Sequence, residues 1–571
     1  MILESLTKLA QSENLLANPD YEPKPVAWIL AVSDGGRFTG AIHTVGEPEK
    51  GKKPRAKVLE IPRRRGRTSG AAADFLVDKS EYVMGVHPEG TRSEEELAER
   101  LGLFRESVAA ANEGAPCAGL AAVLAFLDDV GERQKAIAQV SSDGYVSNDL
   151  FAFEYRGGFV HDVPAVREYF SKMRRAAPVD SMQCLICGAR TTPIRKHPLV
   201  KVRGGSTSGV AIVSFNADAF ESFGLSGSEN APVCMNCADG YTTALTRLMS
   251  DRYPDPRRPG LTLPKRYVQL SPDTTAVYWA DKETEVLHLL DYLESPRVES
   301  VGEMLKAPWK GAGPPDVSNR FYCLVISGGQ GRANLRGMHT GTVEQLERSM
   351  RAYFASIDVG SGRVYSLRRL LESLVLQGKV GNLPAGMPAE VFLAIVFERQ
   401  FPRMLLARAV GRCRVEQEVK PERAAVLRAW MNRNSNEEVS VALDTENTNA
   451  GYRLGRLMAV LERVQARAQN NPNATIVDRF YGAASTRPGT VFPRLVALAQ
   501  HHLAKLHRGE EIGFQKRLGE VMEGIADFPA VLTLEDQGRF ALGYYHQRQE
   551  FFKKAAVGAE VQSDEENKEE L

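Results

Sequence analysis

Short apolar runs separated by turn residues characterise the first third of the chain. Val26–Val32 and Phe38–Val45 are two such runs, and the segment Ser33-Asp34-Gly35-Gly36 between them predicts a β-hairpin. Further elements predicted here are a strand at Ala56–Ile61, a helix from the capping box of Ser93 and Glu96 to about Asn112, and a buried helix at Ala118–Asp128. This part is therefore expected to be mixed α/β.

Helical spacing takes over later in the chain. The middle is predicted to hold strands at Val210–Phe215, Val268–Leu270, Ala276–Ala280 and Phe321–Ile326. From about Val343 onward the pattern is nearly all helical, with a polar interruption at Ser435–Asn449. The tail from Val561 to Leu571 is rich in acidic residues and is predicted to be disordered.

Composition excludes several classes of protein. The chain has 571 residues, of which 43% are hydrophobic, enough to bury several cores. Lysine plus arginine (72) nearly equals aspartate plus glutamate (71), so the overall charge indicates no polyanionic partner. The longest apolar stretch, near Leu120–Leu127, is far shorter than the roughly 20 residues of a membrane helix, and Met1–Ser12 lacks a basic n-region. We expect a cytoplasmic protein.

Four of the seven cysteines form two C-x-x-C pairs, Cys184 with Cys187 and Cys234 with Cys237. Seven cysteines are too few for a disulfide scaffold in so long a chain. Two intervening residues let both thiolates of a pair reach one tetrahedral ion, and two pairs complete a four-cysteine site without an open position. We predict structural Zn²⁺. A redox C-x-x-C is the alternative, but that motif needs a low-pKa cysteine at a helix start and does not come doubled.

With this metal site, the predicted fold class is α+β, in which a mixed N-terminal body with β-hairpins and a zinc-ribbon-like insert is followed by a C-terminal helical bundle. The predicted regions are an N-terminal part at 1–180, the four-cysteine zinc-binding insert with a Gly-rich loop at 181–250, a mixed region turning helical at 251–434, the bundle at 435–560 and the tail at 561–571.

A strongly basic segment breaks the neutral charge balance. It contains one acid, Glu60, and nine basic residues: Lys50, Lys52, Lys53, Arg55, Lys57, Arg63, Arg64, Arg65 and Arg67. A solvated loop is the plain interpretation, and a phosphate-binding loop is the functional one. Pro62 at the end of the preceding strand and the small donors after Arg67 favour the second. The candidate DNA contacts are Arg63, Arg64, Arg65, Arg67, Thr68, Ser69 and Gly70.

A second candidate loop runs from Lys201 to Gly209. Its candidate contacts are Lys201, Arg203, Gly204, Gly205, Ser206, Thr207 and Ser208. Glycines permit close approach of the backbone, and hydroxyls and amides can bind phosphate. A simple hairpin turn is an equally good interpretation, because Walker spacing is absent. The loop Ser327–Arg332 matches no dinucleotide-binding pattern.

The helical end offers a weaker nucleic-acid signal. Leu454, Leu457, Met458, Leu461 and Val464 form an apolar stripe typical of a core face. For Arg453, Arg456, Arg463 and Arg467, a solvated face and a groove that binds a single strand both remain open. The cluster Tyr544–Arg548 is interpreted as a contact that closes the bundle.

No catalytic constellation assembles from the sequence. The histidines at 501, 502 and 507 lack an H-E-x-x-H motif, and outside the tail no acidic cluster suits two metal ions. We therefore expect a protein that is not an enzyme. The alternatives are a metal-dependent nuclease and a zinc-stabilised scaffold that binds only proteins.

Several blocks together resemble a known family, the large subunit of the type I-C CRISPR Cascade complex. They are Ile61–Gly85, Gly204–Asn216 with Ala219–Ser222, Tyr241–Leu245, Asn473–Asp478, Phe492-Pro493 and, above all, Leu542–Gln549. These blocks are spread over essentially the whole chain. They are specific collectively rather than singly.

The resemblance implies a non-catalytic subunit that recognises the protospacer-adjacent motif on duplex DNA, helps to open it and stabilises the R-loop, while the guide RNA reads the sequence. Implied partners are the crRNA-containing complex with its backbone, crRNA-processing and small subunits, the displaced strand, and a helicase-nuclease. By position, Arg67, Thr68 and Ser69 are the first choice for motif contacts, and Gly204–Gly209 is the second.

The helical end is similar to the Cascade small subunit, which such systems also make separately from an internal start. Met431 or Met458 could serve, and a start at Met431 gives 141 residues. Many members of the family do not keep all four cysteines, so zinc is expected to be a local stabiliser.

Overall fold

The computed structural model describes residues 2–16, 20–46, 56–64, 70–175, 181–215, 217–258, 260–306, 318–329, 333–470 and 472–569, without the side chains of residues 175 and 553–569. It divides into two compact units. The first unit comprises Met1–Val200, Ala211–Arg247 and Tyr253–Leu263, and the second comprises Lys201–Val210, Leu248–Arg252 and Pro264–Leu571. The predicted regions 181–250 and 251–434 are thus each divided between the units, since Tyr253–Leu263 belongs to the first, and region 435–560 lies in the second.

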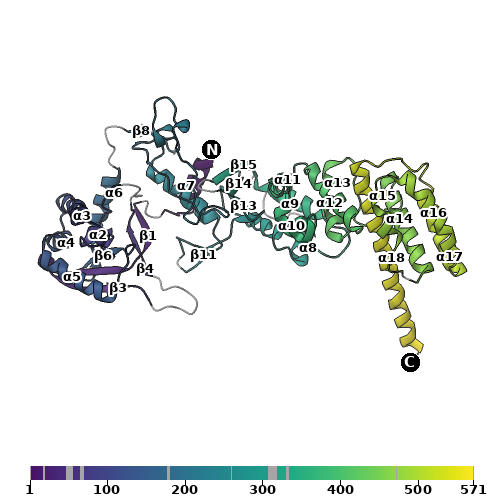
Figure 1. Cartoon of the computed structure of the whole chain (residues 1–571), viewed down its shortest axis with the longest axis horizontal. Coiled ribbons are helices and arrows are strands. Elements are labelled where there is room, and N and C mark those ends of the chain that lie inside the picture. Colours follow the sequence, from purple (N-terminus) through teal and green to yellow (C-terminus); the bar gives the residue numbers. More distant parts are fainter. Residues whose placement is uncertain are drawn as a thin grey trace. The chain divides into compact units, whose positions relative to one another are not determined.

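The first unit combines short sheets with seven helices of the described chain (Figure 1). Its strands are β1 (Tyr21–Val26), β2 (Trp28–Val32), β3 (Phe38–His43), β4 (Lys57–Pro62), β5 (Val77–Asp78), β6 (Phe151–Tyr155), β7 (Gly158–Phe159), β8 (Met182–Gln183), β9 (Arg190–Thr191), β10 (Tyr253–Pro254) and β11 (Thr262–Leu263). Its helices are α1 (Ile2–Ser12), α2 (Ser80–Val83), α3 (Glu94–Gly114), α4 (Ala118–Asp128), α5 (Val130–Asp143), α6 (Pro164–Arg175) and α7 (Met235–Leu248).

The main sheet of the first unit has the strand order β3-β2-β6-β5, and β7 pairs with β6. Strands β2 and β3 pair antiparallel, which confirms the predicted hairpin, and β2 runs parallel to β6. Phe104 of α3 and Phe126 of α4 both contact the ring of Phe153 on β6, so these helices pack on one face of the sheet. The predicted capping box of Ser93 and Glu96 is formed, and it satisfies free N–H groups at the start of α3.

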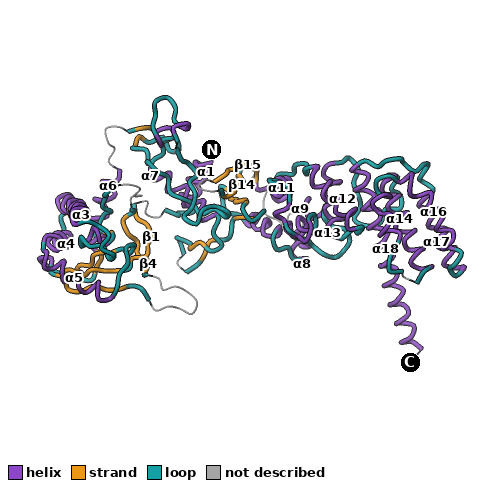
Figure 2. The backbone as a smooth tube through the Cα atoms, viewed as in Figure 1, coloured by secondary structure: helices purple, strands orange, loops and turns teal. Residues whose placement is uncertain are grey.

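The second unit joins one antiparallel sheet to a long helical region, as Figure 2 shows. The sheet has the order β12 (Tyr267–Gln269), β13 (Thr274–Ala280), β14 (Arg320–Gly328) and β15 (Ala333–Thr342). The helices are α8 (Val298–Lys306), α9 (Val343–Ser356), α10 (Leu367–Glu372), α11 (Met387–Val396), α12 (Arg403–Glu416), α13 (Pro421–Asn434), α14 (Ala450–Ala468), α15 (Ile476–Ala484), α16 (Pro488–Leu503), α17 (Arg508–Met522) and α18 (Leu534–Glu569). The mixed α+β class with a helical C-terminal region is therefore confirmed.

One hydrophobic core runs through the second unit, from Val268 on β12 to Tyr545 on α18. The polar segment Ser435–Asn449 is a loop between α13 and α14, yet α18 packs against α12, α13 and α14 alike. Helices on both sides of the predicted boundary therefore share one core. The backbone of α18 is helical as far as Glu569, where the sequence predicts disorder from residue 561.

The prediction of a strand at Val210–Phe215 is wrong. In the described part of this run, only Val210 and Ala211 make single-residue bridges. An apolar run becomes a strand only where a neighbouring strand accepts its hydrogen bonds, and the bends that follow Ala211 leave this run without a ladder. Within the described residues, no helix combines the length and the apolar character needed to cross a bilayer.

Candidate metal centre and nucleic-acid interface

The four cysteines of the two C-x-x-C pairs come together in the first unit. Strands β8 and β9 form a small hairpin that carries Cys184 and Cys187, and Gly188, with a φ of 76°, supplies its left-handed turn. Cys234 precedes α7, and Cys237 lies in the first turn of that helix. Leu185 N–H donates to the Pro232 carbonyl at 2.9 Å, which joins the two ends of the segment.

The sulfur atoms have the spacing that a metal ion needs. All four Sγ atoms lie within 4.8 Å of one another, and Cys187 Sγ is 3.8 Å from Cys234 Sγ. Metal–sulfur bonds of about 2.3 Å in a tetrahedron put sulfur atoms about 3.8 Å apart. All four residues are free cysteines, so no disulfide competes for the sulfurs. The predicted clustering of Cys184, Cys187, Cys234 and Cys237 is confirmed, and the set fits a metal ion held by four thiolates.

The cluster already favours a thiolate. A hydrogen bond from Cys237 lowers the pKa of Cys234 to about 5, and the same contact raises the pKa of Cys237. Cys184 Sγ accepts from the backbone N–H groups of Ile186 and Cys234 at 3.4 and 3.3 Å. Donors aimed at a sulfur stabilise its negative charge, which is the form that binds metal.

The cysteine cluster is connected to Arg63 of the basic segment through Asp239 on α7. Arg63 Nε is 3.4 Å and Arg174 Nη2 is 3.8 Å from Asp239 Oδ2. Burial raises the pKa of Asp239 to about 6, while Arg63 and Arg174 act to lower it. Asp239 is only two residues beyond Cys237, so a shift of the first turn of α7 moves a partner of Arg63. Nothing in the sequence marks Asp239, because its role depends on a contact between distant segments.

The next arginine of the segment is also held by carboxylates. Arg64 Nε is 2.7 Å from Asp74 Oδ2, and its backbone N–H donates to Glu22 at 2.9 Å. The Arg64 side chain is 25% exposed, and Asp74 is buried. Residues 65–69, which include the predicted contacts Arg65, Arg67, Thr68 and Ser69, lie outside the described residues. The ion pair between Arg64 and Asp74 fixes the chain directly before these residues, and Gly70 follows them with a φ of 80°.

The Gly-rich loop belongs to the second unit, where its glycines serve packing. A Cβ on Gly204 would lie 2.7 Å from the Asp273 Cβ, and a Cβ on Gly205 would lie 3.0 Å from the Val202 carbonyl oxygen. Gly328, from the other glycine-rich loop, packs against the same backbone. Ser206 Oγ and Ser208 Oγ are 2.8 Å apart within a turn. Close packing in a turn therefore accounts for these glycines without a bound phosphate.

The two cations of this loop still face solvent. Lys201 is exposed, and the Arg203 guanidinium lies 4.8 Å from the centroid of the Tyr267 ring, with 46% of its side chain exposed. Of the predicted contacts, Thr207 and Ser208 are exposed and Ser206 is half-buried. A cation supported on an aromatic ring can still approach a phosphate. The role of this loop in DNA binding stays a prediction.

The arginines of α14 differ from one another. Arg456 is 2% exposed, and its guanidinium donates to the carbonyls of Asp444 and Thr445. Because it is buried, Arg456 cannot contact a nucleic-acid strand in this structure. Arg453 donates to the Asn447 carbonyl at 2.7 Å, and Arg467 pairs with Glu510 on α17. Arg463 is half-buried.

The cluster on α18 is a core contact, as expected for a bundle-closing group. Its residues Tyr544, Tyr545, His546 and Gln547 are all buried. The Tyr544 hydroxyl donates to Glu462 at 2.8 Å, and His546 Nδ1 is 2.9 Å from the Tyr452 hydroxyl on α14.

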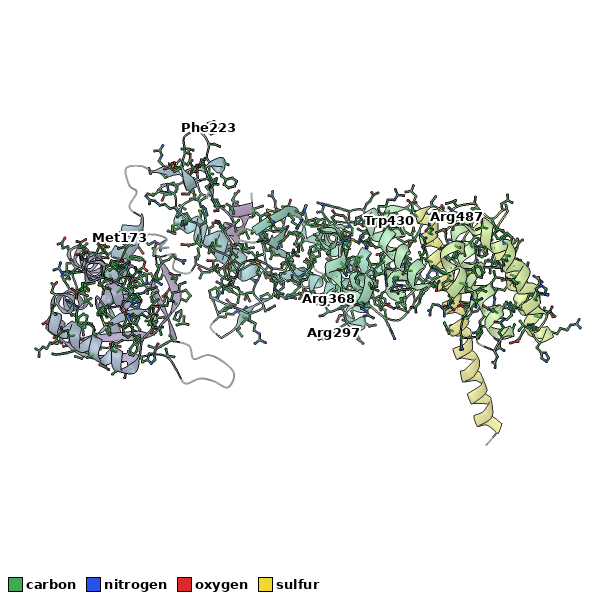
Figure 3. The ribbon with its side chains drawn as sticks, in the orientation of Figure 1. Met173, Phe223, Arg297, Arg368, Trp430 and Arg487 are labelled. Carbon is green, nitrogen blue, oxygen red and sulfur yellow. The ribbon has the colours of Figure 1, made fainter. Side chains whose placement is uncertain are left out.

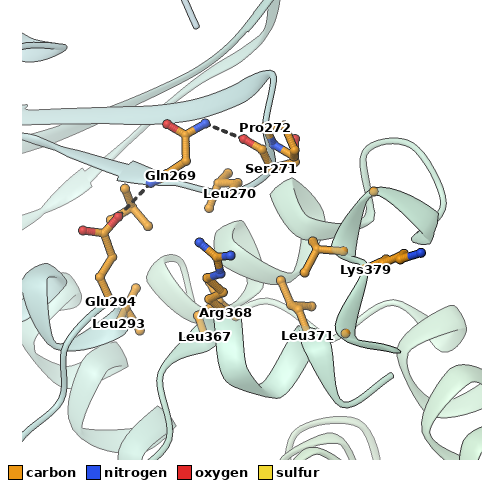
Figure 4. A pocket seen from close by; sticks show the side chains of 14 residues that line it. Gln269, Leu270, Ser271, Pro272, Leu293, Glu294, Leu367, Arg368, Leu371 and Lys379 are labelled. Carbon is orange, nitrogen blue, oxygen red and sulfur yellow. Dashed lines mark hydrogen bonds between the residues drawn. The ribbon is translucent and has the colours of Figure 1, made fainter. Parts of the chain in front are cut away.

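A cavity of about 570 Å³ in the second unit has no counterpart in the sequence analysis. Its apolar lining includes Leu270, Leu293 and Leu371, and Arg368 and Lys379 are the cations at its wall (Figure 4). The lining comes from four separate segments, none of which carries a motif.

A comparison with known families assigns the class of the protein. A family model described as "CRISPR-associated protein (Cas_Csd1)" matches residues 4–552. The match includes the cysteine cluster, the basic segment and the helical end, so this is a CRISPR-associated protein. The chain belongs to the Cas_Csd1 family, the large subunit of the type I-C Cascade, which confirms the resemblance seen in the sequence. Family membership places it in a complex with other CRISPR-associated proteins and crRNA. No curated protein matches the chain.

Proposed function

We propose that this chain recognises the protospacer-adjacent motif on double-stranded target DNA, helps to open the duplex and stabilises the R-loop. It would also support recruitment of the helicase-nuclease for antiviral defence, without a catalytic step of its own. The observation that carries this proposal is the family match over residues 4–552, because it places the chain in an RNA-guided complex. In such complexes base pairing with the guide reads the target sequence, and protein reads only a short motif.

The anchoring of the basic segment supports a positioned DNA contact over a free polycation. The ion pairs of Arg63 with Asp239 and of Arg64 with Asp74 hold the chain directly before residues 65–69. An arginine on a fixed base can make directed contacts to base edges, whereas one on a loose tether makes mainly phosphate contacts. We assign the directed contacts to Arg67, Thr68 and Ser69.

We further propose that the ion at the cysteine cluster is Zn²⁺ with a structural role. Four thiolates leave no open coordination position, which is typical of structural rather than catalytic zinc. Through Asp239 this ion would fix the partner of Arg63. Its loss would therefore disturb the basic segment as well as the insert.

The test compares two DNA substrates on the assembled complex. Arg67→Ala should weaken binding of a motif-bearing duplex by about 10-fold or more, while binding of a target whose strands are already separated changes little. Arg156→Ala is the matched control, since it removes one exposed arginine of the same unit. Equal loss on both substrates would leave only a general phosphate contact and refute motif reading.

The two alternative functions, a metal-dependent nuclease and a scaffold that binds only proteins, predict different results. Cleavage of DNA by the purified chain with Mg²⁺ or Mn²⁺, abolished by one acid-to-alanine change, would favour a metal-dependent nuclease. Wild-type affinity for both DNA substrates after Arg67→Ala and after neutralising Lys201 and Arg203 would favour a scaffold that binds only proteins.

A further inference from the structure

An aromatic side chain is fully exposed to solvent at the tip of the segment between the two cysteine pairs. Phe223 is 101% exposed, and no other large hydrophobic residue in the described chain is as exposed. Figure 3 shows it at the outer end of this segment. Single exposed apolar residues are common on proteins, so exposure alone assigns nothing to Phe223.

The backbone at Phe223 is what sets this residue apart. Phe223 and Gly224 have φ values of 55° and 71°, and Leu225 N–H donates to the Ser222 carbonyl at 3.0 Å. Two positive φ values inside such a hydrogen-bonded turn define type I′, whose first central residue is usually Asn, Asp or Gly. A bulky side chain in this conformation is a genuine outlier. Strain of this kind persists only where the surroundings impose it, and it gathers at functional sites.

Neighbouring side chains impose this backbone conformation on the turn that contains Phe223. Asn230 accepts from the Ser222 N–H at 2.8 Å and donates to the Leu225 carbonyl at 2.8 Å, which fixes both ends of the turn. Glu221 accepts from the Gly227 N–H at 2.7 Å. Side chains outside the turn therefore fix the backbone that presents Phe223, so the turn is ordered before any partner binds.

The charges nearest to Phe223 in the chain indicate the kind of partner. The cations of this segment precede residue 204, no lysine or arginine occurs from 204 to 246, and the exposed acids Asp218, Glu221 and Glu229 lie close to Phe223 in the sequence. These acids repel DNA and RNA phosphates. They attract a protein surface that carries lysine and arginine.

We propose that Phe223 is the anchor of a protein–protein interface and inserts into an apolar pocket, rimmed by basic residues, on another protein subunit of the complex. A rigid aromatic anchor with a polar rim is the usual composition of an interface hot spot. This interface is separate from DNA recognition and does not depend on it. Failure of motif reading at Arg67 therefore leaves the interface untouched.

A photo-cross-linker shows what covers residue 223. The probe, p-benzoylphenylalanine, replaces Phe223 in the chain assembled with crRNA and the other subunits. The complex is irradiated with and without target DNA, and with the helicase-nuclease added. A cross-link to a protein subunit, at a peptide with lysine or arginine beside apolar residues, is the expected result. A cross-link to DNA or RNA, or no cross-link under any of these conditions, overturns the proposal.

Affinity measurements separate the anchor from the fold. Phe223→Asn keeps a residue that tolerates positive φ, so the turn and the metal content should stay intact while affinity for the cross-linked partner falls about 30-fold. Val415→Ala, at another exposed apolar residue, is the control and should bind as wild type. Asp218→Lys should weaken binding and flatten its dependence on salt. Wild-type affinity in Phe223→Asn would refute the anchor.

Discussion

Helices α14 and α18 approach each other so closely that one glycine decides their packing. A Cβ on Gly455 would lie closer than 3.0 Å to the Phe540 carbonyl oxygen, a separation that real Cβ atoms do not reach. Gly543 has the same relation to the Tyr452 carbonyl oxygen. Both obstacles are backbone atoms, which cannot rotate away as a side chain can. Gly455→Ala must therefore push the two helices apart.

Two opposing contributions determine how much Gly455→Ala changes the free energy of unfolding. Alanine in a helix interior stabilises the helix by about 1 kcal/mol relative to glycine. Overpacking a tight core costs about 1–3 kcal/mol. Gly411 on α12 provides the matched control, because a Cβ there would meet no atom within 4 Å. Gly411→Ala should therefore show the helix gain alone, and the two variants should differ by about 1–3 kcal/mol, the cost of the contact.

Thermal unfolding of the full chain measures this difference. In a unit of this size 1 kcal/mol corresponds to about 2 °C, so the melting temperature of Gly455→Ala should lie about 2–6 °C below that of Gly411→Ala. Hydrogen exchange should locate the loss of protection in α14 and α18. If Gly455→Ala melts at or above the temperature of Gly411→Ala, the helices do not approach as closely as described and the reasoning fails.

Three further predictions concern metal, pH and translation. Cys187→Ser should remove about one equivalent of zinc, measured by mass spectrometry, whereas Cys117→Ser outside the cluster should keep it. Burial lowers the pKa of His161 from 6.5 to about 4, although the nearby Asp162 acts to raise it. The unfolded chain therefore binds the proton more readily, and stability present above pH 6.5 should fall by up to about 3 kcal/mol as the pH drops to 4. His161→Phe should flatten this part of the pH–stability curve, and an unchanged curve would argue against His161. Met431→Leu should abolish a short product detected with a C-terminal tag, and Met458→Leu should not, because a start at Met458 would remove the first half of α14. Loss of the product only in Met458→Leu would reverse this assignment.

Local signals in the sequence predicted much of the fold correctly. The hairpin of β2 and β3 depends on the short turn between Val32 and Phe38, and α3 begins at a capping box, so neither requires a distant partner. The cysteine cluster could be predicted equally well from the sequence, because the two-residue spacing within each C-x-x-C pair lets both sulfurs bind one ion. By contrast, Val210–Phe215 has the composition of a strand, but in the structure only Val210 and Ala211 of this run make single-residue bridges.

Predictions that depend on the number of neighbouring elements failed. Arg456 lies beside the apolar stripe of α14 and was expected on an outer face. That helix, however, packs against α15, α16, α17 and α18, so most of its circumference is buried. A single stripe describes a helix that covers one surface, whereas a helix inside a bundle buries polar positions as well, provided that they find hydrogen-bond partners. The carbonyls of Asp444 and Thr445 are those partners.

The four-cysteine cluster has a consequence beyond the insert that carries it. Electrostatic attraction alone does not explain the ion pair of Arg63 with Asp239. Burial raises the pKa of Asp239 to about 6 and so disfavours the charged form of its carboxylate. Breaking a buried pair leaves an uncompensated charge, so both residues require their geometry to be kept. Asp239 lies on the first turns of α7, where Cys237 is also placed, and Arg63 directly precedes Arg64, which pairs with Asp74. A metal ion that fixes the start of α7 therefore also fixes the carboxylate that Arg63 needs. A family member without the cysteines would have to hold this carboxylate by packing instead.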